Sequence, residues 1–70
     1  MTPTVGRIVH YHRPGLLGAA PLAAIVTAAD GTDRVSLVAF EPNACRQHWV
    51  SGVQFAENPT PGCWNWPPRN

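Results

Sequence analysis

The chain has 70 residues and a formal net charge of +1, with five arginines and no lysine against four acidic residues. So short a chain forms one domain (1–70) with a thin core, because it buries only about 60% of its unfolded surface. The small, scattered positive charge excludes the basic stripe that holds duplex nucleic acid. The sequence shows no signal peptide and no apolar run long enough to span a membrane, so we expect a cytoplasmic protein without membrane contact.

Short β-rich runs separated by turn residues predict an all-β domain. The first strand is expected over residues 5–12. A flexible loop of small residues over 15–20 then leads to a second, apolar strand over 22–29. Asp30-Gly31-Thr32-Asp33 predicts a hairpin turn, because Asp-Gly tolerates the positive φ angles that such a turn requires. A third strand over residues 34–40 completes this hairpin.

The second half of the chain is less regular. Residues 44–48 fit either one short helical turn or a loop. A fourth strand is expected within residues 49–56, and a short fifth strand over residues 63–66. This fifth strand lies in a tryptophan-rich C-terminal tail, residues 62–70.

Four to five short strands in 70 residues predict a small antiparallel barrel, either SH3-like or OB-like. Closure into a barrel would also remove the unpaired edges that an open sheet exposes. A helix over residues 16–29 is the alternative, because alanine and leucine favour helix. Pro21 and the β-branched run Ile25-Val26-Thr27 count against it.

Two of the three tryptophans, Trp64 and Trp66, stand two residues apart in the tail. In an extended segment they project from the same side, so we expect one aromatic wall. Termini usually fray unless they are tied down, so the tail is expected to dock on the domain or on a partner. Alternatively the two rings simply complete an undersized core. Trp49 is expected in the core or at a subunit interface.

The first strand places polar groups on both of its faces. Ile8, His10 and His12 share one face, and Arg7, Val9 and Tyr11 share the other. One interpretation is a half-buried strand with structural hydrogen bonds. The other is a pocket for a planar anionic ligand such as a nucleotide, with rings stacking on the base and arginines binding phosphate. The candidate ligand-binding residues are Arg7, His10, Tyr11, Trp64, Asn65, Trp66 and Arg69.

Metal and nucleophile chemistry are weaker hypotheses. His10-x-His12 and Cys45-x-x-His48 have zinc-ligand spacings, but nothing in the sequence pairs the two halves. No third group is identifiable that would orient a base beside a cysteine. We therefore expect no metal, no cofactor and no enzymatic activity, and we expect Cys45 and Cys63 to be free thiols.

The opening Gly6-Arg7-Ile8-Val9-His10-Tyr11 and the closing Gly62-Cys63-Trp64-Asn65-Trp66-Pro67 resemble a group of small, mostly uncharacterised tailed-bacteriophage proteins. The resemblance extends to Pro21–Val26 and Val35–Phe40. The chain departs from this group at Asn65, where a histidine is typical, and at Pro68, where an acidic residue is typical. The resemblance implies a bacteriophage origin and no defined activity, and these departures put any ligand contact at those two positions in doubt.

Two functions fit a compact bacteriophage protein of this kind. The first is a non-enzymatic protein that sequesters a nucleotide-type immune signal as a homo-oligomer in the cytoplasm of the infected host. The second is a virion component, such as a head decoration or tail accessory protein, or an adaptor for a host protein. The polar groups interleaved with the aromatic rings favour the first interpretation over a dry subunit contact.

Overall fold

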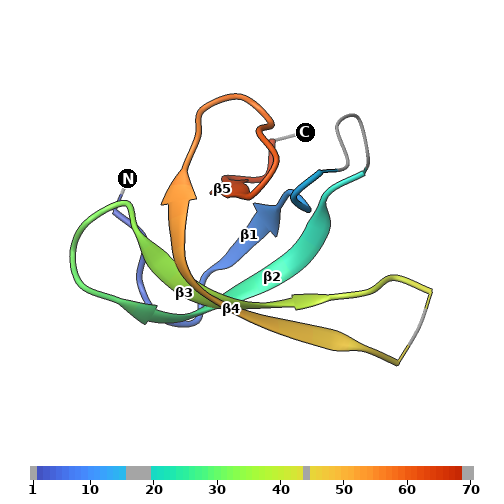
Figure 1. Cartoon of the computed structure of the whole chain (residues 1–70). Coiled ribbons are helices and arrows are strands. Elements are labelled where there is room, and N and C mark those ends of the chain that lie inside the picture. Colours follow the sequence, from blue (N-terminus) through green and yellow to red (C-terminus); the bar gives the residue numbers. More distant parts are fainter. Residues whose placement is uncertain (1, 16–19, 44, 69–70) are drawn as a thin grey trace.

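The computed structural model describes residues 2–15, 20–43 and 45–68, and it places five strands in a closed barrel (Figure 1). The strands are β1 (Ile8–Tyr11), β2 (Leu22–Ala29), β3 (Val35–Phe40), β4 (Gln47–Phe55) and β5 (Cys63–Asn65). Their order around the barrel follows the chain, and β5 pairs with both β4 and β1. The prediction of a small all-β barrel is confirmed.

The barrel is mixed rather than wholly antiparallel. β4 and β5 run parallel, whereas the other four strand pairings are antiparallel. The segment between β4 and β5 returns the chain to the end of the barrel at which β4 begins to pair with β5. β5 therefore runs in the same direction as β4. The sequential order also lacks the Greek-key connection of an OB-fold.

The hairpin of β3 and β4 is longer than the sequence indicates. Gln47 and His48 pair with Phe40 and Ala39 and open β4, so the prediction of a helical turn or loop over residues 44–48 is wrong for these two. Ala44 lies outside the described residues. We call the described outer part of the hairpin, residues 40–43 and 45–49, the arm; Figure 1 shows it projecting to the lower right, away from the barrel.

The other segment predictions have mixed outcomes. β2 excludes the helical alternative from residues 22–29 and has the bounds that we expected. β1 is shorter than predicted, because only residues 8–11 belong to the strand. The predicted flexible loop falls largely on residues 16–19, which lie outside the described residues.

The barrel interior is filled by alternating side chains from all five strands. The buried hydrophobic residues are Val9, Tyr11, Leu22, Ala24, Val26, Val35, Leu37, Ala39, Val53 and Trp64. Trp64 is the largest of the fully buried side chains. In β1, Val9 and Tyr11 point inward while Ile8 is exposed and His10 half-buried, as the strand period of two requires.

A β-bulge lies in β4 between the part that belongs to the arm and the part that belongs to the barrel wall. Val35 pairs with Val53 but Leu37 pairs with Val50, so β4 carries one extra residue at this point. Gly52 adopts a φ of +66° there, and a Cβ at this position would lie 3.4 Å from the Arg34 guanidinium. Because bulges bend a strand, β4 changes direction between its arm half and its barrel half.

Trp64 connects three parts of the barrel. Trp64 is the register partner of Tyr11 in β1 and of Phe55 in β4. Its ring meets the Phe55 ring edge-on, with 5.0 Å between the ring centroids. Its indole Nε1–H donates a hydrogen bond of 2.9 Å to the Asp33 carbonyl in the β2–β3 turn. The ring therefore fills the interior without leaving a buried polar group unpaired.

We predict that Trp64→Ala lowers the free energy of unfolding by about 3–5 kcal/mol, because it opens a large cavity in a thin core. Trp49→Ala is the matched control: Trp49 is 75% exposed, and its loss should change the stability of the dilute protein by no more than about 0.5 kcal/mol. Urea unfolding followed by circular dichroism measures both. Equal losses in the two variants would contradict this placement of Trp64.

The β2–β3 turn is held by side-chain hydrogen bonds. The Thr32 hydroxyl and backbone N–H both donate to Asp30 Oδ1, at 2.6 and 3.1 Å. The Thr32 hydroxyl in turn accepts the Arg34 N–H at 3.2 Å. The two hydrogen bonds from Thr32 lower the pKa of the Asp30 carboxyl below its ordinary value of 3.8, because they stabilise its charged form.

We predict that Thr32→Val moves the pKa of Asp30 back toward 3.8 without restoring it fully, because the backbone N–H still donates. An NMR titration of the Asp30 carboxyl carbon measures this. Since the pKa is lowered by folding, the stabilisation is present above pH 3.8 and is lost as the pH falls through the lower, folded-state value. Thr60→Val, in the β4–β5 loop, should leave the titration unchanged; a shift of the same size there would contradict the assignment to Thr32.

Candidate functional site

The aromatic residues proposed for ligand binding lie largely inside the barrel. Trp64 has no exposed surface and Tyr11 is 6% exposed, so neither ring offers a face for stacking. Burial, followed by the neighbouring Cys63, raises the pKa of the Tyr11 hydroxyl above its ordinary value of 10. Tyr11 is therefore neutral at physiological pH and acts as a core residue.

The tail docks on its own domain. Trp66 is half-buried, packs against the core, and meets Trp64 edge-on at 5.1 Å between ring centroids. The Arg7 guanidinium carbon lies 5.7 Å from the centre of the Trp66 ring, which is within the range of a cation–π contact. Trp64 and Trp66 are thus neighbours, as their spacing predicts, but they face the interior and the Arg7 side chain.

The polar candidates lie on the outside of β1 and β5. His10 and Asn65 are register partners across the two strands. Asn65 Oδ1 accepts a 3.0 Å hydrogen bond from Nε2 of His12, a ring that is only 9% exposed. Arg69 lies outside the described residues. The structure therefore brings Arg7 and Trp66 together at one place and His10 and Asn65 at another, with Tyr11 and Trp64 in the core.

A continuous apolar stripe crosses the outside of four neighbouring strands. Ile8 pairs with Ile25, Ile25 with Val38, and Val38 with Trp49. Ile8 is 63% exposed and Trp49 75% exposed, while Ile25 and Val38 are more covered. We call these four residues the apolar belt; three strand spacings give it a length of roughly 14 Å.

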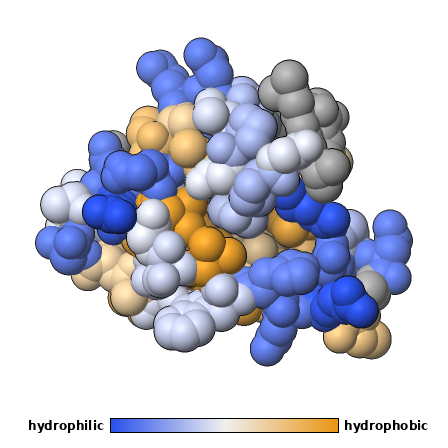
Figure 2. All heavy atoms as spheres, in the orientation of Figure 1, coloured by the Kyte–Doolittle hydropathy of each residue, from blue (hydrophilic) through white to orange (hydrophobic). Residues whose placement is uncertain are grey.

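The next row of register partners runs beside the apolar belt and contains no Asp, Glu, Lys or Arg. It consists of Asn65, His10, Ala23, Phe40 and Gln47. Phe40 is 37% exposed and adds a second aromatic ring to the β3–β4 end of the surface. Figure 2 shows hydrophobic residues in the middle of the visible face, surrounded by more hydrophilic ones.

Sequence reasoning did not identify the apolar belt as a site. Its prediction of a core position for Trp49 is wrong, because Trp49 continues the outward alternation of β4; an interface position stays a prediction. The register of the hairpins could have indicated the belt, because it places Ile25, Val38 and Trp49 side by side. Uncovered apolar side chains that form a contiguous surface mark a binding surface more often than scattered ones do.

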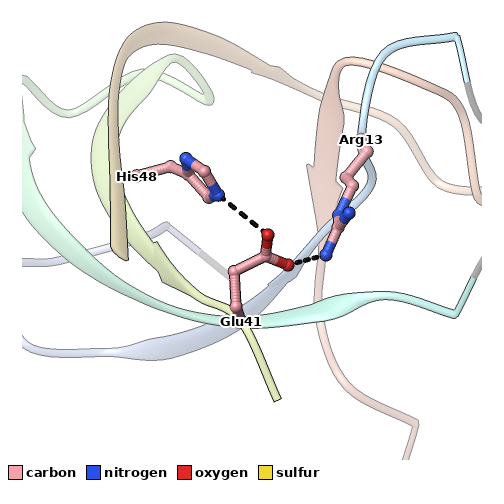
Figure 3. Close-up of polar contacts among 3 residues, drawn as sticks. All are labelled: Arg13, Glu41 and His48. Atoms are coloured by element: carbon pink, nitrogen blue, oxygen red, sulfur yellow. Dashed lines mark hydrogen bonds and ion pairs between the residues drawn. The ribbon is translucent and has the colours of Figure 1, made fainter. Parts of the chain in front are cut away.

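An ion-pair cluster holds the base of the arm against the barrel (Figure 3). Glu41, on the inner side of the arm, forms an ion pair with Arg13, which follows β1. The other Glu41 oxygen accepts a 3.3 Å hydrogen bond from His48 Nε2 in β4. Since a carboxylate only accepts, His48 must carry its proton on Nε2. The cluster fixes the direction of the arm that presents Trp49.

A concave feature lies in the described part of the chain, away from the apolar belt. A shallow hollow of about 270 Å³ lies at the β2–β3 end, lined by Ala28, Ala29, Asp30, Arg34, Val35, Ser36 and Gly52. Asp30 and Arg34 stand there with opposite charges, so the hollow has no net charge that would attract an ionic ligand.

Groups that could support other chemistry are sparse in the described ranges. No three His, Cys, Asp or Glu side chains there gather into a possible metal site, and both Cys45 and Cys63 are free thiols. None of the described segments is a helix capable of crossing a bilayer.

No protein-family model matches the chain, and comparisons with curated proteins and with solved structures find no match either.

We predict that Glu41→Gln loosens the arm while leaving the barrel intact, because it removes the ion pair with Arg13 and keeps the side-chain shape. Amide exchange should become faster in residues 47–49, and stability should fall by no more than about 1 kcal/mol, since the pair is partly exposed. Glu57→Gln, which removes the same charge from an exposed loop, is the control. Equal exchange rates in the two variants would contradict the role of Glu41.

Proposed function

We propose that the protein is a non-enzymatic accessory subunit of a bacteriophage particle, held against neighbouring protein subunits through the apolar belt. The observation that carries this proposal is the unbroken line of outward-facing apolar side chains across four strands, with Ile8 and Trp49 exposed at its two ends. The bacteriophage setting comes from the sequence resemblance of the two ends of the chain. The surface chemistry supports a dry protein contact, since an apolar centre with a polar rim is the usual anatomy of an interface.

Trp49 is the expected centre of this contact. Tryptophan is enriched among the residues that dominate interface energies, and it is most effective when a partner excludes water from it. Trp49 lies on the arm, whose base is fixed by the Glu41 cluster, so little conformational freedom is lost when a partner covers it. A pre-oriented arm therefore lowers the entropic cost of covering Trp49 with a partner.

The alternative, sequestration of a nucleotide-type ligand, has less support from the geometry. It requires open ring faces near the tail, and Trp64 and Tyr11 present none. Arg7 already lies over the Trp66 ring. A base would have to displace Arg7 from the ring, and the arginine that would bind phosphate would lose its present contact.

We predict that the wild-type chain is present in purified particles of its source bacteriophage and that Trp49→Ser is lost from them. Mass spectrometry of the particles measures the copy number, and circular dichroism of the isolated variant checks that the barrel is folded. Gln54→Ser, at an exposed position in the same strand, should be retained. Absence of the wild-type chain from the particles would overturn the proposal, as would retention of Trp49→Ser at the wild-type level.

A further inference from the structure

The two ends of the apolar belt face different directions. The belt crosses β1, β2, β3 and β4, and closure of the barrel turns the outer face of each strand away from that of its neighbour. Val38 and Trp49 of the belt, together with Phe40 of the adjacent row, form what we call the arm end of the belt. Ile8 and Ile25 form the β1 end. A single flat partner surface therefore cannot cover Trp49 and Ile8 of one chain together.

Both ends are suited to contact with each other. Neither the belt nor the adjacent row of register partners contains Asp, Glu, Lys or Arg, so a second copy of the chain meets no like charge there. The arm end is a projecting aromatic surface, and the β1 end is a pair of smaller branched side chains. A bulky ring on an aliphatic surface is a contact that excludes water from both.

The chain has surface enough for two such contacts. A standard interface removes about 800 Å² from each partner, which is roughly one sixth of the 4772 Å² that this chain exposes. A 70-residue domain also has a small core, and chains of this size often gain stability from neighbouring copies.

We infer that copies of this chain associate head to tail, with the arm end of one copy packed on the β1 end of the next. This inference rests on the proposed function, because it uses the same belt, and it names the partner as a further copy. A two-fold contact buries the same patch on both copies, so a contact at the arm end would leave Ile8 uncovered. A head-to-tail contact covers both ends with one kind of interface, and it gives a ring of three or more copies when the rotation closes.

Two capping variants test the arrangement. Trp49→Asp places a charge at the arm end and leaves the β1 end unchanged. Ile8→Asp places a charge at the β1 end and leaves the arm end unchanged. Both positions are more than half exposed, so both variants should keep the folded barrel. Asn58→Asp, in the exposed β4–β5 loop, adds the same charge away from the belt and is the control. Sedimentation velocity of the isolated proteins measures the number of associated copies.

We predict that the wild type and Asn58→Asp sediment as assemblies larger than a dimer. Each capping variant alone should be a monomer, with association weakened about 30-fold or more, as expected at the centre of an interface. An equimolar mixture of the two capping variants should form a one-to-one heterodimer and nothing larger, because one intact arm end meets one intact β1 end.

Other outcomes overturn the inference in recognisable ways. A wild-type dimer, or an Ile8→Asp variant that assembles normally, would show a two-fold contact instead. A mixture that stays monomeric would exclude the contact between the two ends. A wild type that is monomeric in isolation but is incorporated into particles through Trp49 would overturn the head-to-tail inference and leave the proposed function standing.

Discussion

Closure of the barrel depends on a strand of three residues. β5 pairs with β1 through Tyr11 and with β4 through Phe55, and both pairings involve Trp64. Two backbone hydrogen bonds between His12 and the 62–63 segment, at 2.7 and 3.0 Å, extend the β1 side of this seam. Because so few backbone pairs hold the last strand, the buried Trp64 ring supplies much of the contact that keeps the barrel closed.

The sequence was most informative where a local pattern decides the structure. The Asp30–Asp33 turn and the flanking apolar runs define the β2–β3 hairpin, and the tail was expected to dock because of its two tryptophans. The parallel pairing of β4 with β5 was not predictable, since it depends on how the 56–62 segment returns across the barrel. The start of β4 at Gln47 was equally hidden, because a polar Gln-His pair carries no strand signal and becomes strand only by pairing with β3.

For both the candidate ligand site and the apolar belt, the sequence shows the residue types but not whether they are buried or exposed. Aromatic and polar residues in the tail are visible in the chain, but their burial is a property of the closed barrel. Trp64 and Tyr11 look like ligand contacts until the strand pairing places them inside. Conversely, Ile8, Ile25 and Val38 look like ordinary core residues, because an apolar residue in a strand is expected to be buried. Only the register places them beside Trp49 on the outer surface.

The bulge at Gly52 divides β4 into a part in the barrel wall and a part that leads into the arm. On its C-terminal side, Val53 and Phe55 belong to the core and to the seam with β5. On its N-terminal side, Trp49 lies on the arm, and the Glu41 cluster anchors that segment to the end of β1. Side chains on the outer face of the arm can therefore change without disturbing the barrel interior. A strand divided in this way lets a domain with a thin core expose a tryptophan that it does not use for its own stability.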